Sequence, residues 1–151
     1  MSIELIQMQT SDVAEVKALE DVLFPVDAWT HEMFHNEIAE IGVSREVMVA
    51  RLAGALVGYV SLRYAGAQGD VVTIAVDGSA QKQGIGTAMM NWLEAAAVRH
   101  GVTELFLEVR SDNIPAVAMY LARDFERIDL RRNYYAAGVD AYVMRKRLRR
   151  G

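Results

Sequence analysis

The sequence predicts one α/β domain of the mixed (α+β) kind, with about four helices on the faces of a central sheet of about seven strands. Apolar segments with strand character alternate with segments of helical apolar spacing in the order βααβββαβαββ. The 151 residues fit one domain, and no linker, repeat or low-complexity segment divides residues 1–151. Because 52% of the residues are apolar, a sizeable core is expected.

The first half of the chain is expected to form a strand, two helices and a hairpin. Alternation predicts the first strand, and apolar residues three and four apart predict the helices. Thr10-Ser11-Asp12 offers N-caps to the first helix, and Pro25 ends it. The expected elements are a strand at 3–8, a helix to about Phe24 with the stripe Val13, Val16, Leu19 and Leu23, a helix from Thr30 with Met33, Phe34 and Ile38 inward, and strands at 46–52 and 56–64 joined by Ala53-Gly54.

The second half is expected to place an apolar strand at the centre of the sheet. Residues 71–76 are almost wholly apolar, as in a strand buried on both faces. Gly101 closes the following helix as its C′ residue, and Asp124 closes the next helix in a left-handed conformation. The remaining expected elements are a loop at 77–86, a helix at 86–100, a strand at 104–109, a helix at 113–123, and strands at 125–135 and 142–147.

The composition excludes several classes of chemistry. The chain has no cysteine, so disulfides, thiolate zinc sites and a cysteine nucleophile are excluded. His31 and His35 lie four apart on a helix, but no third ligand is evident, so we expect no metal and a solvated helix face there. The first residues lack the features of a signal peptide, and no apolar run is long enough to span a membrane, so a cytoplasmic protein is expected.

The charge distribution favours basic partners. The net charge is −4, and five of the cations lie in the basic tail at 145–150, which leaves 11 basic and 20 acidic residues elsewhere. An acidic surface repels nucleic-acid phosphates and attracts cations, so no direct nucleic-acid binding is expected. The tail could contact RNA by itself, although a solvated basic end is favoured.

The segment Gln81-Lys82-Gln83-Gly84-Ile85-Gly86 has the features of a phosphate loop. It precedes a helix N-terminus, where unpaired N–H groups attract anions, and glycines allow close backbone approach. It lacks the Gly-Lys-Ser/Thr of a P-loop and the third glycine of a dinucleotide fingerprint. From the residues alone, a phosphate site and a structural turn remain equally open.

The same segment resembles the Q/R-x-x-G-x-G/A signature of the GNAT acetyltransferases, and the order of elements is also that of this superfamily. The resemblance implies that the loop binds the pyrophosphate of coenzyme A, with acetyl-CoA as co-substrate, and that the preceding strand contributes. The cofactor-binding residues implied are Ile74, Ala75, Val76, Lys82, Gln83, Gly84, Ile85, Gly86, Thr87 and Asn113.

Further motifs resemble the ribosomal-protein alanine N-acetyltransferases, the RimI type, within that superfamily. These motifs are Leu107-Glu108-Val109-Arg110, Asn113, Ala118-Met119-Tyr120, Arg131-Arg132-Asn133-Tyr134-Tyr135, and Phe24-Pro25 followed by Trp29-Thr30. The sequence departs from the group at three places: Val26-Asp27-Ala28 lengthens the substrate-side loop, Gly78 replaces a common proline, and Asp124 replaces a common glycine.

Two residues are candidates for acid–base catalysis. Glu108 interrupts an apolar strand, where burial is expected to raise its pKa towards about 6–7 and make it a useful base. Since Arg110 lies on the same face, a structural ion pair between the two is the alternative. Tyr120 can donate a proton to a thiolate, but a tyrosine on a short helix is also a common core residue. The resemblance implies the catalytic role for both residues. Asn113 is a possible N-cap, to which the resemblance adds a coenzyme A contact.

The resemblance implies a protein substrate. Trp29, Tyr134 and Tyr135 are expected to contact it, although the two tyrosines could instead cover the sheet edge. The hypothesis is direct acetyl transfer to the N-terminal α-amine of a basic protein segment, with small-subunit ribosomal protein eighteen as the implied target. Acetylation of a lysine or small amine, and coenzyme A sensing without catalysis, are the alternatives.

Overall fold

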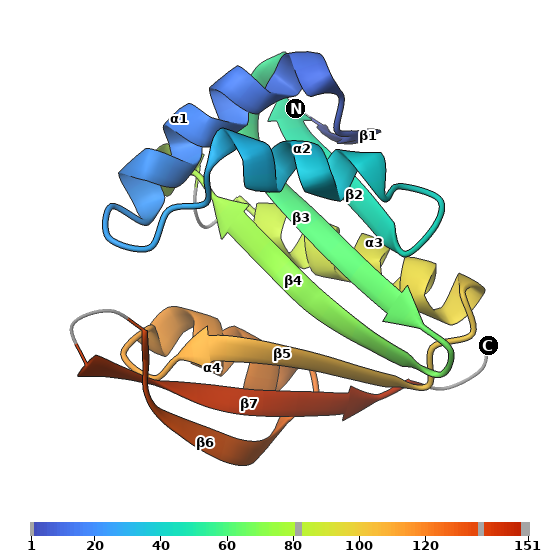
Figure 1. Ribbon diagram of the computed structural model, residues 1–151, viewed down its shortest axis with the longest axis vertical. Helices are drawn as coiled ribbons and strands as arrows, with labels where there is room; N and C mark the ends of the chain where they lie inside the picture. The colour runs from blue at the N-terminus through green and yellow to red at the C-terminus, as the bar shows by residue number, and fades with distance from the viewer. Residues whose placement is uncertain (1, 81–82, 136–137, 149–151) are drawn as a thin grey trace.

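The computed structural model describes residues 2–80, 83–135 and 138–148 and shows seven strands in one mixed sheet (Figure 1). The strand order is β1-β2-β3-β4-β5-β7-β6. All neighbours are antiparallel except β4 and β5. The strands are β1 (Ile3–Gln7), β2 (Arg45–Leu52), β3 (Ala55–Ala65), β4 (Gln68–Val76), β5 (Glu104–Arg110), β6 (Glu126–Tyr135) and β7 (Val139–Arg147).

The sheet splits between β4 and β5. These two strands are paired only between residues 68–70 and 104–106. Beyond that short ladder they diverge, so the two halves of the sheet form a V that is open at one end (Figure 1). β4 is the middle strand of the seven, as predicted. Its apolar residues line a cleft, however, and several remain partly exposed.

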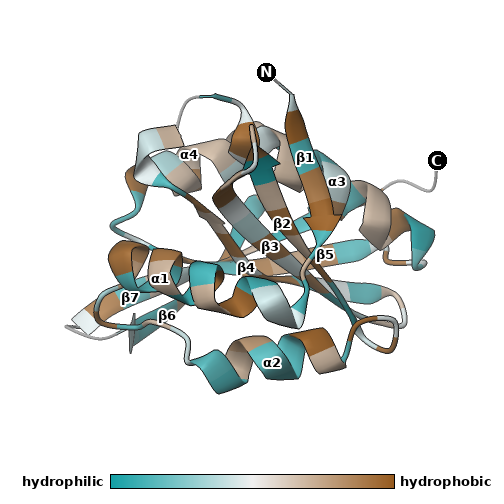
Figure 2. Cartoon of the chain, turned by 90° about the horizontal axis from the view of Figure 1, so that it is seen from above, coloured by the Kyte–Doolittle hydropathy of each residue, from teal (hydrophilic) through white to brown (hydrophobic). Residues whose placement is uncertain are grey.

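In the described part of the chain, four α-helices and two 3₁₀ turns cover the sheet. α1 and α2 pack on one face of the first half and α3 packs on the opposite face, while α4 lies against the second half (Figures 1 and 2). Two apolar clusters result, one under α1 and α2 and a larger one under α3 and α4. The helical elements are η1 (Thr10–Asp12), α1 (Val13–Leu23), α2 (His31–Ala39), η2 (Gly78–Ala80), α3 (Ile85–Arg99) and α4 (Ile114–Ala122). No helix in the described ranges is long and apolar enough to cross a membrane.

Most helix boundaries and turns follow the sequence signals. The Thr30 side chain caps α2 by accepting a hydrogen bond from the Met33 N–H at 3.1 Å. Gly101 and Asp124 both have positive φ after their helices, as predicted. Thr10-Ser11-Asp12 does not cap α1 as expected. It forms η1, and Asp12 accepts from the Gln9 N–H at 2.8 Å instead.

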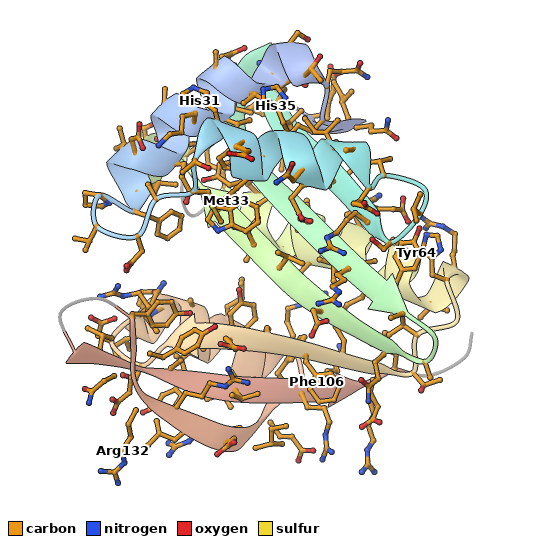
Figure 3. All side chains as sticks on the ribbon, viewed as in Figure 1. His31, Met33, His35, Tyr64, Phe106 and Arg132 are labelled. Carbon is orange, nitrogen blue, oxygen red and sulfur yellow. The ribbon has the colours of Figure 1, made fainter. Side chains whose placement is uncertain are left out.

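The predicted apolar face of α1 is confirmed, and that of α2 is wrong only for Met33. Each helix also buries a glutamate, which was not predicted. Glu20 is buried beside the stripe of α1, in which Leu19 is partly exposed and packs against the apolar cluster. Glu37 is buried on α2, whereas Met33 is 41% exposed and points towards the gap between the two halves (Figure 3). Both carboxylates have polar partners on the sheet, which makes their burial tolerable.

The basic tail begins as strand rather than as a free end. Residues 145–147 belong to β7, and the cations of Arg145 and Lys146 are paired with carboxylates. Arg145 lies 2.7 Å from Glu126, and the Lys146 Nζ lies 2.6 Å from Glu94. The interpretation of this stretch as solvated was therefore wrong for those two residues. Arg149 and Arg150 lie outside the described residues.

Candidate active site

The divergence of β4 and β5 leaves a cavity of about 650 Å³ between the two halves of the sheet. Because β5 does not pair with β4 beyond Asp70, the facing edge of β4 has backbone groups free to bind another chain or ligand. Four carboxylates and one guanidinium are among the side chains around the cavity. The lining residues are Glu20, Leu23, Phe24, Pro25, Val26, Asp27, Trp29, Val71, Val72, Thr73, Ile74, Leu107, Glu108, Val109, Arg110, Asp112, Asn113, Ala116, Tyr120 and Tyr135.

Glu108 projects from β5 into this cavity. Its side chain is 30% exposed, so the strand does not enclose it as fully as the apolar sequence indicated. One carboxylate oxygen, Oε2, is buried and accepts no hydrogen bond from a described residue. The other, Oε1, lies 3.7 Å from Arg131. The structure therefore leaves half of the carboxylate without a structural partner in the described part of the chain.

The alternative ion pair between Glu108 and Arg110 was wrong. Arg110 directs its guanidinium towards Asp112, at 3.1 Å, and Asp27, at 3.2 Å. These two carboxylates hold Arg110 away from Glu108, although both side chains leave the same face of β5. The cation near Glu108 comes instead from β6, as Arg131.

Tyr120 lines the same cavity from α4. It is only 5% exposed and packs edge-to-face on Phe125, with ring centroids 5.7 Å apart. Burial, and to a smaller degree the neighbouring Tyr135, raises the pKa of the Tyr120 phenol above its usual value. A phenol in this position keeps its proton at neutral pH and can act as a donor. Tyr120 is thus a core residue that also faces the cavity.

The described part of the glycine loop, Gln83 and Gly84, leads directly into the N-terminus of α3. Gly84 is the N-cap of α3 and has φ of +79°, a conformation that side-chain-bearing residues seldom adopt. The Ile85 side chain is buried in the core, so only its backbone is available to a ligand. Gln83 and Thr87 are exposed beside it. Gln81 and Lys82 lie outside the described residues.

The residues implied in cofactor binding do not all meet at one surface. Of those with a described position, Ile74 and Asn113 line the cavity. Ala75 is buried against the cluster under α1 and α2, and Val76 packs against the opposite cluster. Asn113 is the N-cap of α4, as predicted, and its Oδ1 accepts from the Ala116 N–H at 3.2 Å. Coenzyme binding by these residues stays a prediction. They lie at the start of α3, on β4 and at the start of α4.

Trp29 and Tyr135 form parts of the cavity wall from opposite halves of the fold. Tyr134 is not among the lining residues: it is 49% exposed and packs on Tyr135, with centroids 5.2 Å apart. The Glu108 carboxylate, and then partial burial, raise the pKa of the Tyr134 phenol. Burial and the same carboxylate raise the pKa of Tyr135 to about 12. Both phenols therefore stay neutral beside Glu108.

Sequence reasoning missed Glu20, which is 3% exposed. Its carboxylate accepts hydrogen bonds from the Tyr59 hydroxyl and from the Trp29 N–H, the latter at 2.9 Å. It thereby joins Trp29, at the end of the loop between α1 and α2, to β3. The available signal was its spacing of four from Val16, which places Glu20 on the apolar face of α1.

The two histidines of α2 take no part in this site. His31 and His35 are exposed and lie on the side of α2 away from the cleft (Figure 3). Across residues 2–80, 83–135 and 138–148, no three His, Cys, Asp or Glu side chains come together in a way that could hold a metal ion.

The fold and this cleft define an acetyltransferase of the GNAT kind, and the chain belongs to the acetyltransferase (GNAT) family, which matches residues 13–125. It is 38% identical over 142 residues to the N-alpha-acetyltransferase RimI of Mycobacterium tuberculosis, covering 90% of this chain and 87% of that protein. It is 31% identical over 147 residues to an N-alpha-acetyltransferase of Sulfolobus acidocaldarius, covering 89% and 86%.

A solved structure agrees with these relatives. The crystal structure of the ribosomal-protein-S18-alanine N-acetyltransferase from Escherichia coli superimposes with a TM-score of 0.85 at 25% identity, covering 97% of this chain and 94% of that one. The predicted GNAT fold is thereby confirmed, as is the resemblance to the RimI type.

Proposed function

We propose that this protein transfers the acetyl group of acetyl-CoA to the N-terminal α-amine of a protein by direct attack. The main support is one observation: Glu108 and Tyr120, a carboxylate and a neutral phenol, line the same cavity where β4 and β5 diverge. Amide formation from an ammonium and a thioester requires a group that takes a proton and a group that gives one. Membership of the GNAT family and two N-alpha-acetyltransferase relatives add support.

Acetyl-CoA fits the residues at the two helix N-termini. The first turn of α3 offers backbone N–H groups behind Gly84, which suit a pyrophosphate. The free edge of β4 around Ile74 suits the amide-bearing arm of the coenzyme, and Asn113 stands at the start of α4. When bound, acetyl-CoA supplies the activated acetyl group.

Glu108 is assigned the base and Tyr120 the acid. Glu108, directly or through a water molecule, removes a proton from the substrate ammonium, and the neutral amine nitrogen then forms a bond to the acetyl carbon. The carbon–sulfur bond breaks as the tetrahedral arrangement collapses. Tyr120 gives its proton to the departing thiolate. The second proton of the attacking nitrogen passes, directly or through water, to the tyrosinate, and Glu108 releases its proton to solvent. The chain has no cysteine, so no acetyl-thiol enzyme forms.

An α-amine suits this base better than a lysine side chain does. Its pKa is about 7.7–8.0, compared with about 10.4 for lysine. Supplying the neutral amine at pH 7 therefore costs about 1 kcal/mol for the first and about 4.6 kcal/mol for the second, at about 1.36 kcal/mol per pKa unit.

The finer proposal concerns the target: a basic segment that begins with alanine, such as that of small-subunit ribosomal protein eighteen, acetylated in the cytoplasm. The E. coli structure that superimposes on this chain is named for that substrate. Four carboxylates and one guanidinium around the cavity favour cationic peptides, as does the overall charge of −4.

The test is release of coenzyme A with a panel of acceptors. The panel contains peptides with Ala-Arg starts, the same peptides with neutral residues after alanine, lysine peptides with blocked N-termini, and polyamines. The proposal predicts the highest kcat/KM for Ala-Arg starts, with a preference over neutral peptides that shrinks as salt is added. Equal or better turnover of polyamines would place the protein among small-amine acetyltransferases. Coenzyme A binding without turnover of any acceptor would favour a sensor.

A further inference from the structure

One guanidinium joins three chain segments at the entrance of the cavity. Arg110, the last residue of β5, pairs through Nε and Nη2 with both carboxylate oxygens of Asp112, at 3.1 and 3.2 Å. Its Nη1 lies 3.2 Å from Asp27, in the loop between α1 and α2. Its guanidinium carbon also lies 5.4 Å from the centre of the Tyr135 ring, at the end of β6.

The contact with Asp27 crosses the opening of the V. The loop between α1 and α2 belongs to the upper half of the molecule in Figure 1, whereas the ends of β5 and β6 belong to the lower half. Phe24, Pro25 and Val26, which precede Asp27 in this loop, line the cavity from above. Their position relative to Tyr135 therefore depends on what holds the loop.

Two contacts hold the loop between α1 and α2, and they differ in how far they are exposed to solvent. At its far end, the buried Glu20 accepts a hydrogen bond from the Trp29 N–H, and this contact is partly buried. At its middle, the Asp27 and Arg110 side chains are each about one-third exposed, at 33% and 31%. Loss of the second contact should release Phe24, Pro25 and Val26 without unfolding α1.

We propose that Arg110 is a positioning residue that sets the width of the substrate entrance by holding Asp27 against the Tyr135 side. The lengthened loop at Val26-Asp27-Ala28 supplies the partner for this contact. With the loop held, the wall formed by Pro25 and Val26 stays close to the path of the incoming N-terminus and admits small first side chains. The inference rests on the proposed acetylation of N-terminal amines.

The contact acts on peptide binding and selection, not on acyl transfer. Arg110 is directed away from Glu108 by its two carboxylate partners, so its exchange leaves the base in place. Releasing the loop removes a preformed wall, and the peptide must then order the loop as it binds. Release of the loop therefore raises KM for a peptide with a small first residue. It also raises the kcat/KM of peptides with bulky first residues relative to that of peptides with small ones.

The experiment measures kcat and KM at saturating acetyl-CoA for two peptides that differ only in the first residue, alanine or leucine. The variants are Arg110→Gln, Asp27→Asn, the double variant, and Arg110→Lys. Arg99→Gln is the matched control, because Arg99 pairs with Glu46 at the end of α3 away from the cleft. Asp27→Asn leaves the Arg110–Asp112 pair intact, so the test remains available if Arg110→Gln unfolds.

The expected result is a rise in KM for the alanine peptide of about three- to tenfold in Arg110→Gln and Asp27→Asn, with kcat within about twofold. The ratio of kcat/KM between alanine and leucine peptides should fall by a similar factor. The double variant should be no worse than Arg110→Gln, since the two residues act through one contact. Arg110→Lys should recover part of the loss, and Arg99→Gln should match the wild type.

Three results would overturn this inference in distinguishable ways. If the wild type acetylates both peptides but the variants keep its KM and its preference, Arg110 does not position the entrance, and the proposed function stands. If the wild type acetylates neither peptide at its N-terminus, the proposed function fails and this inference fails with it. Additive effects in the double variant would also contradict it, because they would show two independent contacts.

Discussion

Removal of the buried Tyr59 hydroxyl should measure how much its hydrogen bond to Glu20 stabilises the fold. Tyr59 is fully buried on β3, and its hydroxyl donates to Glu20, which is 3% exposed. Tyr59→Phe removes only that donor and leaves the carboxylate with the Trp29 N–H, at 2.9 Å, as its remaining partner. A hydrogen bond to a charged group contributes about 1.5–3 kcal/mol.

Tyr59→Phe should therefore lower the free energy of unfolding by about 1.5–3 kcal/mol. At about 2–4 °C per kcal/mol for a domain of this size, the melting temperature should fall by about 3–12 °C. Urea unfolding followed by circular dichroism gives the free energy directly. Adding Glu20→Gln should recover part of the loss relative to Tyr59→Phe alone, because a neutral amide is less costly to bury with one partner missing.

Tyr64→Phe is the matched control. The Tyr64 ring stacks on His100 at a centroid distance of 3.8 Å, far from Glu20, and the change leaves no buried carboxylate without a donor. Its effect should stay within about 0.5 kcal/mol. If Tyr59→Phe behaves like this control, Glu20 does not depend on the hydroxyl and the reasoning is refuted.

Three further outcomes follow from the site. Glu108→Gln should lower kcat by about 10²–10⁴-fold with little change in acetyl-CoA affinity, and unchanged kcat from pH 6 to 9 would make Glu108 structural. Because the pKa of the Tyr120 phenol is raised above its usual value of about 10, the phenol stays protonated in the folded protein up to at least about pH 10. The wild-type kcat should therefore show no decrease from deprotonation of Tyr120 below about pH 10. The Tyr120→Phe variant should have a low kcat at every pH. Acetyl-CoA at about 100 times its dissociation constant should add about 2.7 kcal/mol to the free energy of unfolding, measured by thermal shift. Gly84→Val should abolish that response, because Gly84 has φ of +79°, which valine rarely adopts, at the helix N-terminus proposed to bind the pyrophosphate.

Much of the fold could be predicted from the sequence because its signals are local. Apolar spacing, the capping Thr30 and Asn113, and the left-handed Gly101 and Asp124 each act within one or two turns of chain. The central place of residues 71–76 followed from their apolar run. Glu108 and Tyr120 were found by family motifs, and the structure brings them to one cavity.

The remaining features depend on contacts between distant segments, which spacing does not encode. The partner of Arg110 could not be deduced from β5 alone, since Asp27 is 83 residues away. The burial of Glu20 depends on Tyr59, 39 residues away on β3. The cleft exists because the parallel strands β4 and β5 stay paired over only three residues each. Each strand has an uninterrupted strand pattern in the sequence, so the point where their pairing ends could not be predicted.

The most direct measurement is mass spectrometry of one peptide that carries a free N-terminal alanine and an internal lysine, after incubation with the protein and acetyl-CoA. The proposed function predicts one acetyl group on the α-amine and an unmodified lysine, with Glu108→Gln giving little of either product. The same peptide with a blocked N-terminus should remain unmodified. Acetyl found mainly on the lysine, or on neither amine while free polyamines are modified, would contradict N-terminal acetylation.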